Sequence, residues 1–402
     1  MNRHAFAPRS WMALALLPLS LTTGCRPHDF PQYPANYREY LYVSNGQSNT
    51  VTVLDVVNMR LDREVAVGVN PLAVTVNPTR NEVYVLNKGA ESGLGSISVL
   101  DAEKNSLSAT ITVGKAPLSL EVSQDGKLAY VTNSGSNSVS VIDLKARREI
   151  TQIGVGEEPA ATRLSPDGHT LVVANRKAGS VSVVDLPPTP VASGYHLRAA
   201  FDGCPGATHA VVLPDSSKAF VACGDGHQVL SIQLARQAHG QTLTAPAQTA
   251  RPDRLEAVLD VGKNPVELAI KPDGGELFAL NASSGSISEV VTSTADVGGA
   301  YLMGNHPIHG IVSADNTLLY VANVESQYVT LYAIDDGKRA GSVHVGDGPS
   351  AMAFSAGRHL LFVVDTGSND VAAVRTATRS LFTLLPAGRG PNAIADKSFT
   401  LQ

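Results

Sequence analysis

Short apolar segments that end in a polar residue, usually asparagine, recur along the chain. One of them, residues 129–133 (AYVTN), is followed by a turn rich in Ser, Gly and Asn and then by residues 139–143 (VSVID). In the second segment apolar and polar residues alternate, which is typical of a β-strand with two different faces, and the turn suits a hairpin. The first segment has eight copies, which begin at Leu41, Val83, Ala129, Leu171, Ala219, Leu277, Leu319 and Leu361.

A Gly-x-x-Pro corner precedes most copies of a further strand made of small residues. Gly68–Pro71, Gly114–Pro117 and Gly156–Pro159 are examples, and the whole unit repeats every 46 residues or so, a period of about one four-stranded propeller blade. A single blade cannot bury both faces, whereas blades stacked around a ring can. The sequence therefore predicts an all-β fold, a β-propeller of eight blades over residues 41–398, with the N- and C-terminal strands sharing one blade.

Composition supports strands and gives no sign of nucleic-acid binding. The chain has 402 residues, 43% of them hydrophobic but only 5% aromatic, so its core is built mainly from Val, Leu, Ile and Ala. A net charge of −5 gives no basic footprint, and we expect no nucleic acid among the partners.

The first residues resemble an export signal. Two arginines precede an 11-residue apolar stretch, residues 11–21, which is too short to span a bilayer. Leu21-Thr22-Thr23-Gly24-Cys25 resembles a bacterial lipobox, so we expect residues 1–24 to be a lipoprotein signal peptide and Cys25 to be lipidated. The alternative is an ordinary signal peptide with an incidental cysteine. If Cys25 is lipidated, residues 25–40 are the lipidated Cys and a tether to the membrane, and Arg26 after Cys25 favours the outer membrane by resemblance.

Tyr130-Val131-Thr132-Asn133, followed by Ser138–Asp143, resembles the YVTN β-propeller repeat family. The resemblance covers nearly all of residues 41–398. It implies an exported or surface-exposed propeller, in most members without known catalysis. Members usually have seven blades, so seven is the alternative to the eight repeats counted in this chain.

Aligning the inner strands on the corner proline brings three ionisable residues to one level. The position two after the proline is Ala or Ser in five repeats and is His209, Glu267 and His309 in three consecutive ones. Two histidines and a carboxylate suit zinc or a similar ion such as copper, and His306 could join them. Alternatively these are unrelated polar residues in a wet channel, too far apart for one ion.

The two remaining cysteines fall in the same repeat as His209. If Cys25 is lipidated, Cys204 and Cys223 form an even pair in an oxidising compartment, which suggests one disulfide. Cys204 takes the corner glycine position and Cys223 the strand-end asparagine position. Residues 204–209 and 220–226 are also similar to periplasmic zinc-chaperone propellers.

Three functions are compatible with these patterns. The first is a non-enzymatic scaffold in the cell envelope that binds a protein or a small ligand, with the insertion 235–256 as one candidate surface. The second is a zinc- or copper-binding propeller or metallochaperone centred on His209, Glu267 and His309. The third is a propeller hydrolase or lactonase, which the single carboxylate at the aligned level, with Glu121 one pleat deeper, does not favour.

Overall fold

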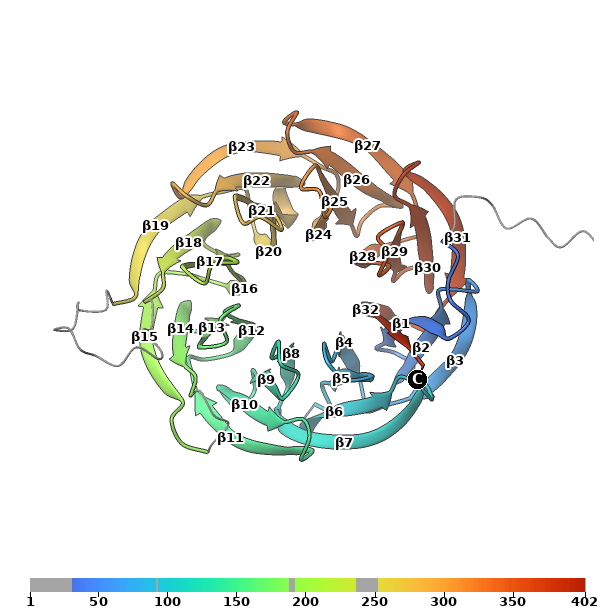
Figure 1. Ribbon diagram of the computed structural model, residues 1–402. Coiled ribbons are helices and arrows are strands. Elements are labelled where there is room, and N and C mark those ends of the chain that lie inside the picture. The colour runs from blue at the N-terminus through green and yellow to red at the C-terminus, as the bar shows by residue number, and fades with distance from the viewer. Residues whose placement is uncertain (1–30, 92, 188–191, 236–251, 402) are drawn as a thin grey trace, which may run out of the picture. The chain divides into compact units, whose positions relative to one another are not determined.

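The strands form eight sheets that stand around a ring. The computed structural model describes residues 31–91, 93–187, 192–235 and 252–401. Within these residues the strands make eight four-stranded antiparallel sheets, which confirms the eight-bladed propeller, and residues from Ala35 onward form one compact unit (Figure 1). Each innermost strand contacts the innermost strand of the next blade, and the last contacts the first, so the ring is closed.

The blades are lettered A to H, and their strands are given from the centre to the rim. Blade A has β32 (Pro391–Thr400), β1 (Tyr37–Asn45), β2 (Thr50–Asp55) and β3 (Arg60–Ala66). Blade B has β4 (Pro71–Val76), β5 (Glu82–Asn87), β6 (Leu94–Asp101) and β7 (Ser106–Lys115). Blade C has β8 (Pro117–Val122), β9 (Leu128–Asn133), β10 (Ser138–Asp143) and β11 (Arg148–Gly154). Blade D has β12 (Pro159–Leu164), β13 (Thr170–Asn175), β14 (Ser180–Asp185) and β15 (His196–Asp202).

The second half of the ring repeats this order. Blade E has β16 (Ala207–Val212), β17 (Lys218–Cys223), β18 (Gln228–Gln233) and β19 (Arg254–Asp260). Blade F has β20 (Pro265–Ile270), β21 (Glu276–Asn281), β22 (Ser286–Val291) and β23 (Asp296–Leu302), with the short 3-10 helix η1 (Ala282–Ser284) between β21 and β22. Blade G has β24 (Pro307–Val312), β25 (Leu318–Asn323), β26 (Tyr328–Ala333) and β27 (Lys338–His344). Blade H has β28 (Pro349–Phe354), β29 (Leu360–Asp365), β30 (Asp370–Arg375) and β31 (Ser380–Pro386).

Blade A is shared by the two ends of the chain, as the sequence predicts. β1 pairs antiparallel with β32, and Tyr42 stands opposite Ala395 in that pairing. β1 begins at Tyr37, earlier than residue 41, and β32 continues to Thr400. Because strands from both ends of the chain make up one blade, backbone hydrogen bonds between β1 and β32 close the ring.

The corner glycine and the strand-end asparagine recur together because they occupy one space. A Cβ atom on Gly68 would lie 2.5 Å from the side chain of Asn87, and one on Gly114 would lie 2.5 Å from that of Asn133. The asparagine amide in turn bonds hydroxyl groups of the next strand, as Asn133 Nδ2 does with Ser140 Oγ at 2.9 Å. The two repeat residues therefore lock the corner onto the blade that follows.

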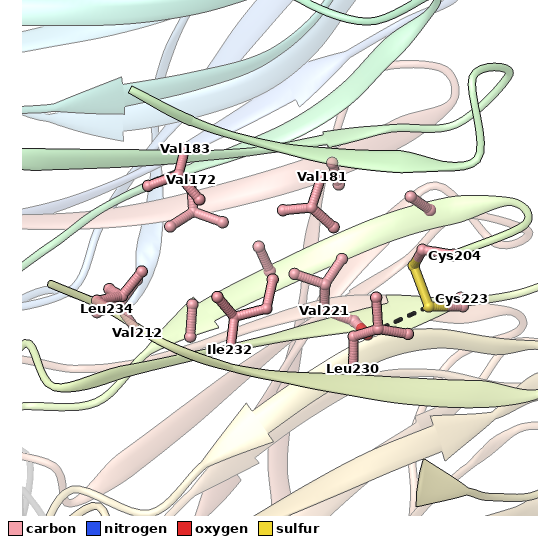
Figure 2. Close-up of a cluster of buried hydrophobic side chains, with 14 residues drawn as sticks. Val172, Val181, Val183, Cys204, Val212, Val221, Cys223, Leu230, Ile232 and Leu234 are labelled. Atoms are coloured by element: carbon pink, nitrogen blue, oxygen red, sulfur yellow. Dashed lines mark hydrogen bonds between the residues drawn. A yellow bond between two sulfur atoms is a disulfide. The ribbon is translucent and has the colours of Figure 1, made fainter. Parts of the chain in front are cut away.

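The core lies between neighbouring blades. Between blades D and E, Val172, Val181 and Val183 pack against Val221, Leu230 and Ile232 (Figure 2). Cys204 and Cys223 belong to the same buried cluster. Aliphatic residues fill this space, in agreement with the low aromatic content of the chain.

Several predictions from the sequence lie outside the described residues. These are the signal peptide 1–24, the lipidated Cys25, the tether as far as residue 30, and residues 236–251 of the insertion 235–256. In the part of the chain that the structure describes, no helix is long and apolar enough to cross a membrane.

Candidate functional site

The inner strands of blades E, F and G carry the three ionisable residues at one level. His209 on β16 stands opposite Ala222, Glu267 on β20 opposite Leu280, and His309 on β24 opposite Ala322. In each blade that partner directly precedes the residue at the strand end. The register therefore confirms the alignment made from the corner prolines, including the one for β16, which has no proline.

Glu267 and His309 form an ion pair across neighbouring blades. His309 Nδ1 lies 2.9 Å from Glu267 Oε2, and His309 Nε2 lies 3.4 Å from the Met352 carbonyl oxygen. Burial disfavours the charged forms of both groups, but the attraction between the Glu267 carboxylate and the His309 imidazolium is stronger than this effect. The pKa of Glu267 is lowered and that of His309 is raised. The imidazolium form lets both nitrogens of His309 donate, one to the carboxylate and one to the carbonyl.

His209 is in a different protonation state. Burial lowers the pKa of His209 to about 4, although the charge of Glu267 acts in the opposite direction. His209 Nδ1 accepts a hydrogen bond of 3.2 Å from the Leu268 amide, so the ring proton is assigned to Nε2. No described residue bonds this Nε2 group. His209 is therefore a neutral imidazole with one free donor.

The structure does not gather the predicted metal ligands into one centre. Among the described residues, no group of three or more His, Cys, Asp or Glu side chains is arranged to hold a metal ion. Glu267 and His309 contact each other, whereas His209 bonds the backbone of β20. His306 lies at the corner before β24, where its Nδ1 is 3.6 Å from Glu325 Oε1.

Arg163 is an ionisable residue of the inner strands that the sequence alignment did not single out. It lies on β12, and its guanidinium is 3.3 Å from Glu121 Oε2 on β8. Burial raises the pKa of Glu121, and Arg163 offsets this only in part. Arg163 stands two residues after Ala161, which occupies the aligned level, so extending the same alignment by one pleat identifies it.

Side chains on the inner strands also bond the backbone of the next inner strand. Ser119 Oγ accepts a hydrogen bond of 3.3 Å from the Thr162 amide, just as His209 does from Leu268. The channel-facing edge of an inner strand has no partner strand, so these side chains satisfy backbone groups there. Further bonds of this kind join Arg163 to the Ala210 carbonyl, Glu267 to the Gly310 amide and Thr208 to the Pro265 carbonyl.

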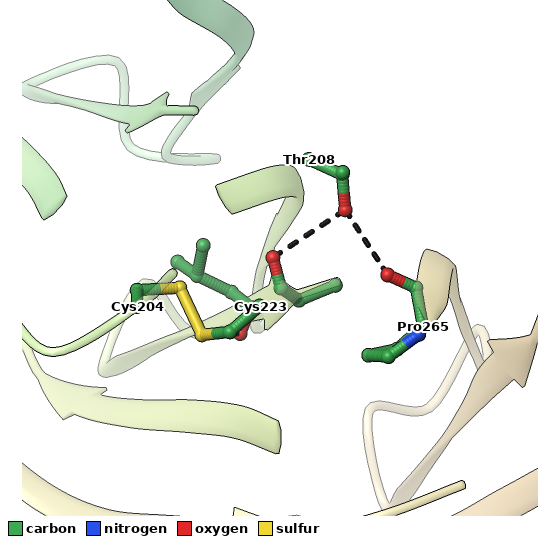
Figure 3. Close-up of a disulfide and its surroundings, with 6 residues drawn as sticks. Cys204, Thr208, Cys223 and Pro265 are labelled. Atoms are coloured by element: carbon green, nitrogen blue, oxygen red, sulfur yellow. Dashed lines mark hydrogen bonds between the residues drawn. A yellow bond between two sulfur atoms is a disulfide. The ribbon is translucent and has the colours of Figure 1, made fainter. Parts of the chain in front are cut away.

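Cys204 and Cys223 are joined by a disulfide, with their Cα atoms 4.8 Å apart. They occupy the positions at which the other blades place the corner glycine and its strand-end partner, so a covalent bond replaces that packing contact. Thr208, just beyond this corner, donates to the Pro265 carbonyl of the next blade at 3.2 Å (Figure 3). The disulfide therefore fixes the corner from which β16 and His209 start.

The fold is an eight-bladed β-propeller, and His209, Glu267 and His309 form a polar sector on one part of its inner wall. The family model "Lactonase, 7-bladed beta-propeller" matches residues 44–157, which run from the end of β1 to the corner before β12. "Uncharacterized protein YncE" from Salmonella typhi and its counterpart from Salmonella typhimurium are each 35% identical over 91 residues. That match covers 23% of this chain and 24% of either relative, so the chain spans about a quarter of the length of the curated relatives it matches.

Solved structures show the same architecture at low sequence identity. The chain is similar to dihydro-heme d1 dehydrogenase NirN (TM-score 0.68, 15% identity), covering 92% of this chain and 77% of that one. It is also similar to apo AztD from Citrobacter koseri (TM-score 0.61, 14% identity, 90% and 98% covered). A putative 6-phosphogluconolactonase from Bacteroides uniformis gives a TM-score of 0.60 at 13% identity, with 90% and 100% covered. At these identities the likeness concerns the fold.

Proposed function

We propose that this chain is an exported, lipid-anchored binding protein that holds a small polar ligand at the mouth of the propeller channel without catalysing a reaction. The observation that carries the proposal is the division of the inner wall at one level. His209, Glu267 and His309 occupy three neighbouring inner strands, and the same level holds Ala or Ser on the other five. Small side chains on the opposite part of the wall leave room for a ligand.

The polar sector offers fixed groups of defined charge. The side chains of Glu267 and His309 are 17% and 28% exposed, so solvent in the channel reaches them. His209 contributes a neutral N–H that no described residue uses. A ligand with a hydrogen-bond acceptor near His209 and a polar or cationic group near Glu267 would fit, because pre-oriented groups bind with little loss of side-chain freedom.

The cell envelope is the proposed location. Support comes from the apolar stretch and the lipobox-like segment that ends at Cys25, and from the disulfide, which forms in oxidising compartments. A tethered propeller would sample ligands, metal ions or partner proteins at the membrane surface. We propose no nucleic-acid partner.

The test is enrichment of a ligand from small molecules of the source organism. Residues 26–402 are dialysed to equilibrium against a small-molecule extract, and the bound fraction is identified by mass spectrometry, with zinc and copper counted in the same samples. The variants are His209→Ala, which removes the free donor, and Glu267→Gln. Ser119→Ala is the matched control, because Ser119 occupies the same level on β8.

The proposal expects one organic compound near one equivalent in the wild type and the control, and its loss in His209→Ala. One equivalent of metal, lost in the same variant, would favour the metallochaperone function instead. A compound that is chemically converted during dialysis by the wild type alone would favour an enzyme. Equal retention by all four proteins would refute a site at this level of the channel.

A further inference from the structure

The Gly-x-x-Pro corners share a hydrogen-bonding pattern at their two central residues. The amide of the third corner residue is capped by a side chain of the preceding blade at four corners: Asn49 caps Asn70, Asn137 caps Glu158, His227 caps Asn264 and Asn369 caps Gly390, at 2.8 to 3.1 Å. The amide of the second residue is capped by a serine of the following blade at three corners: Ser136 caps Lys115, Ser284 caps Lys263 and Ser368 caps Asp347, at 2.9 to 3.0 Å. Six corners therefore have a partner within the protein for at least one of these two amides.

The corner between blades F and G lacks both caps. Gly285 occupies the position from which the preceding blade would cap the His306 amide, and it has no side chain to do so. Ser326 occupies the position that would cap the Asn305 amide, but its hydroxyl donates to the Asn323 carbonyl at 2.8 Å. Neither amide is bonded within the described structure. Two consecutive backbone donors therefore remain free at one place.

The backbone at this corner contains a residue in the left-handed region. His306 has a φ of 56°, in the left-handed region. Successive N–H groups at a turn that contains such a residue form a concavity that binds anions. The uncapped corner has this form without a protein group to fill it.

A cavity of about 500 Å³ lies at this corner, within the range of ligand sites. Asn305 and His306 line it together with Ser283, Leu302 and Arg339. Arg339 is exposed and forms no ion pair with any described carboxylate. Leu302 is 77% exposed, so an apolar surface lies beside the free donors.

We infer that this corner pocket binds the carboxylate or phosphate group of a small organic anion. The Asn305 and His306 amides hold two of its oxygens, the Arg339 guanidinium supplies the charge, and Leu302 covers the apolar part of the ligand. Glu325, which also lines the cavity and lies 3.6 Å from His306, opposes the anion. The site uses none of the channel residues, so it stands apart from the function proposed above.

Binding is measured by isothermal titration calorimetry at low ionic strength with two probes, hexanoate and inorganic phosphate, on residues 26–402. The variants are Arg339→Ala, Leu302→Ser and Glu325→Gln. Arg389→Ala is the matched control, because Arg389 takes the place of Asn305 at a corner whose next amide, that of Gly390, is capped. Unfolding temperatures of all variants establish that each is folded.

We expect Arg339→Ala to weaken binding about ten- to a hundredfold, the effect of a lost hydrogen bond to a charged group. Glu325→Gln should tighten binding and Arg389→Ala should leave it unchanged. If Leu302→Ser weakens hexanoate alone, the ligand is a carboxylate with an apolar body; if phosphate binds more tightly and Leu302→Ser has no effect, it is a phosphate group. The inference is overturned if neither probe saturates the wild type, or if Arg339→Ala and Arg389→Ala have the same effect.

Discussion

Blade H carries an acid where six other blades carry an asparagine, and replacing it should stabilise the protein. Asp365 ends β29, is fully buried, and stands opposite Asp370 on β30. Its Oδ2 accepts a hydrogen bond of 2.9 Å from the Gly346 amide. Burial, with the neighbouring charge of Asp370, raises the pKa of Asp365 to about 8. Asp365 therefore keeps a proton near neutral pH and takes the place of an asparagine amide.

The magnitude follows from proton linkage. The unfolded chain loses this proton near the usual aspartate pKa of 3.8, whereas the folded chain keeps it to about pH 8. Because the folded pKa is the higher one, the contribution of this group to stability is complete below pH 3.8 and falls as the pH rises to 8. At pH 7 the loss reaches about 4 kcal/mol, from roughly 1.4 kcal/mol for each pH unit.

Asp365→Asn removes this titration and supplies an amide that can donate to Asp370. We expect its free energy of unfolding at pH 7 to rise by about 1–4 kcal/mol. For a unit as long as residues 35–402, at ~2.1 cal/mol/K per residue, this raises the Tm by about 1–5 °C. The gain should shrink towards pH 4. The assay is thermal unfolding from pH 4 to 9 for the wild type and the variant.

Asn133→Asp is the reverse control, because it places an acid at the same position of blade C. It should destabilise the protein and make the stability more dependent on pH. An Asp365→Asn variant that is no more stable than the wild type at pH 7, or whose difference from it does not change with pH, would refute the reasoning.

Two further predictions concern the ion pair and the disulfide. His309→Ala should lower the free energy of unfolding most near pH 5–6.5. Glu267 stabilises the fold above its unfolded pKa, and this stabilisation is lost as the pH falls through its lowered folded pKa. His309 stabilises the fold below its unfolded pKa, and this stabilisation is lost as the pH rises through its raised folded pKa. An effect of His309→Ala on thermal unfolding that does not depend on pH would contradict the ion pair. Reduction of the disulfide, which joins residues 19 apart in sequence, should lower the free energy of unfolding by about 3 kcal/mol. The double variant Cys204→Gly, Cys223→Asn restores the residues of the other blades and should recover part of that loss in denaturant unfolding. Equal stability of the reduced wild type and the double variant would show that this pair of residues cannot replace the disulfide in blade E.

The architecture could be predicted from the sequence because each repeat corresponds to one four-stranded blade. The strand-end asparagines and corner prolines recur at fixed positions, and the register of the strands follows from them. The level shared by His209, Glu267 and His309 was predictable for the same reason, since a residue's position after the corner sets its height on the wall. The start of β1 was not, because residues 37–40 lie outside the repeat and are ordered by pairing with β32.

The contacts within the site could not be predicted from the sequence alone. The position of His306 beside Pro307 suggested that it could join the cluster, but its left-handed backbone accompanies a contact with Glu325 instead. The pairing of Arg163 with Glu121 joins the neighbouring blades C and D and depends on the spacing of their inner strands. The uncapped corner likewise becomes visible only when hydrogen bonds of all eight corners are compared.

The most direct test of the proposed channel site is the protonation state of its histidines, measured by NMR on protein labelled with ¹⁵N-histidine and assigned with the His209→Ala and His309→Ala variants. The proposal predicts that His209 is neutral, with its proton on Nε2, from pH 8 to about pH 5, and that His309 has both nitrogens protonated at pH 6. A His209 that titrates near 6.5, or that carries its proton on Nδ1, would contradict the free donor on which the proposed ligand site depends.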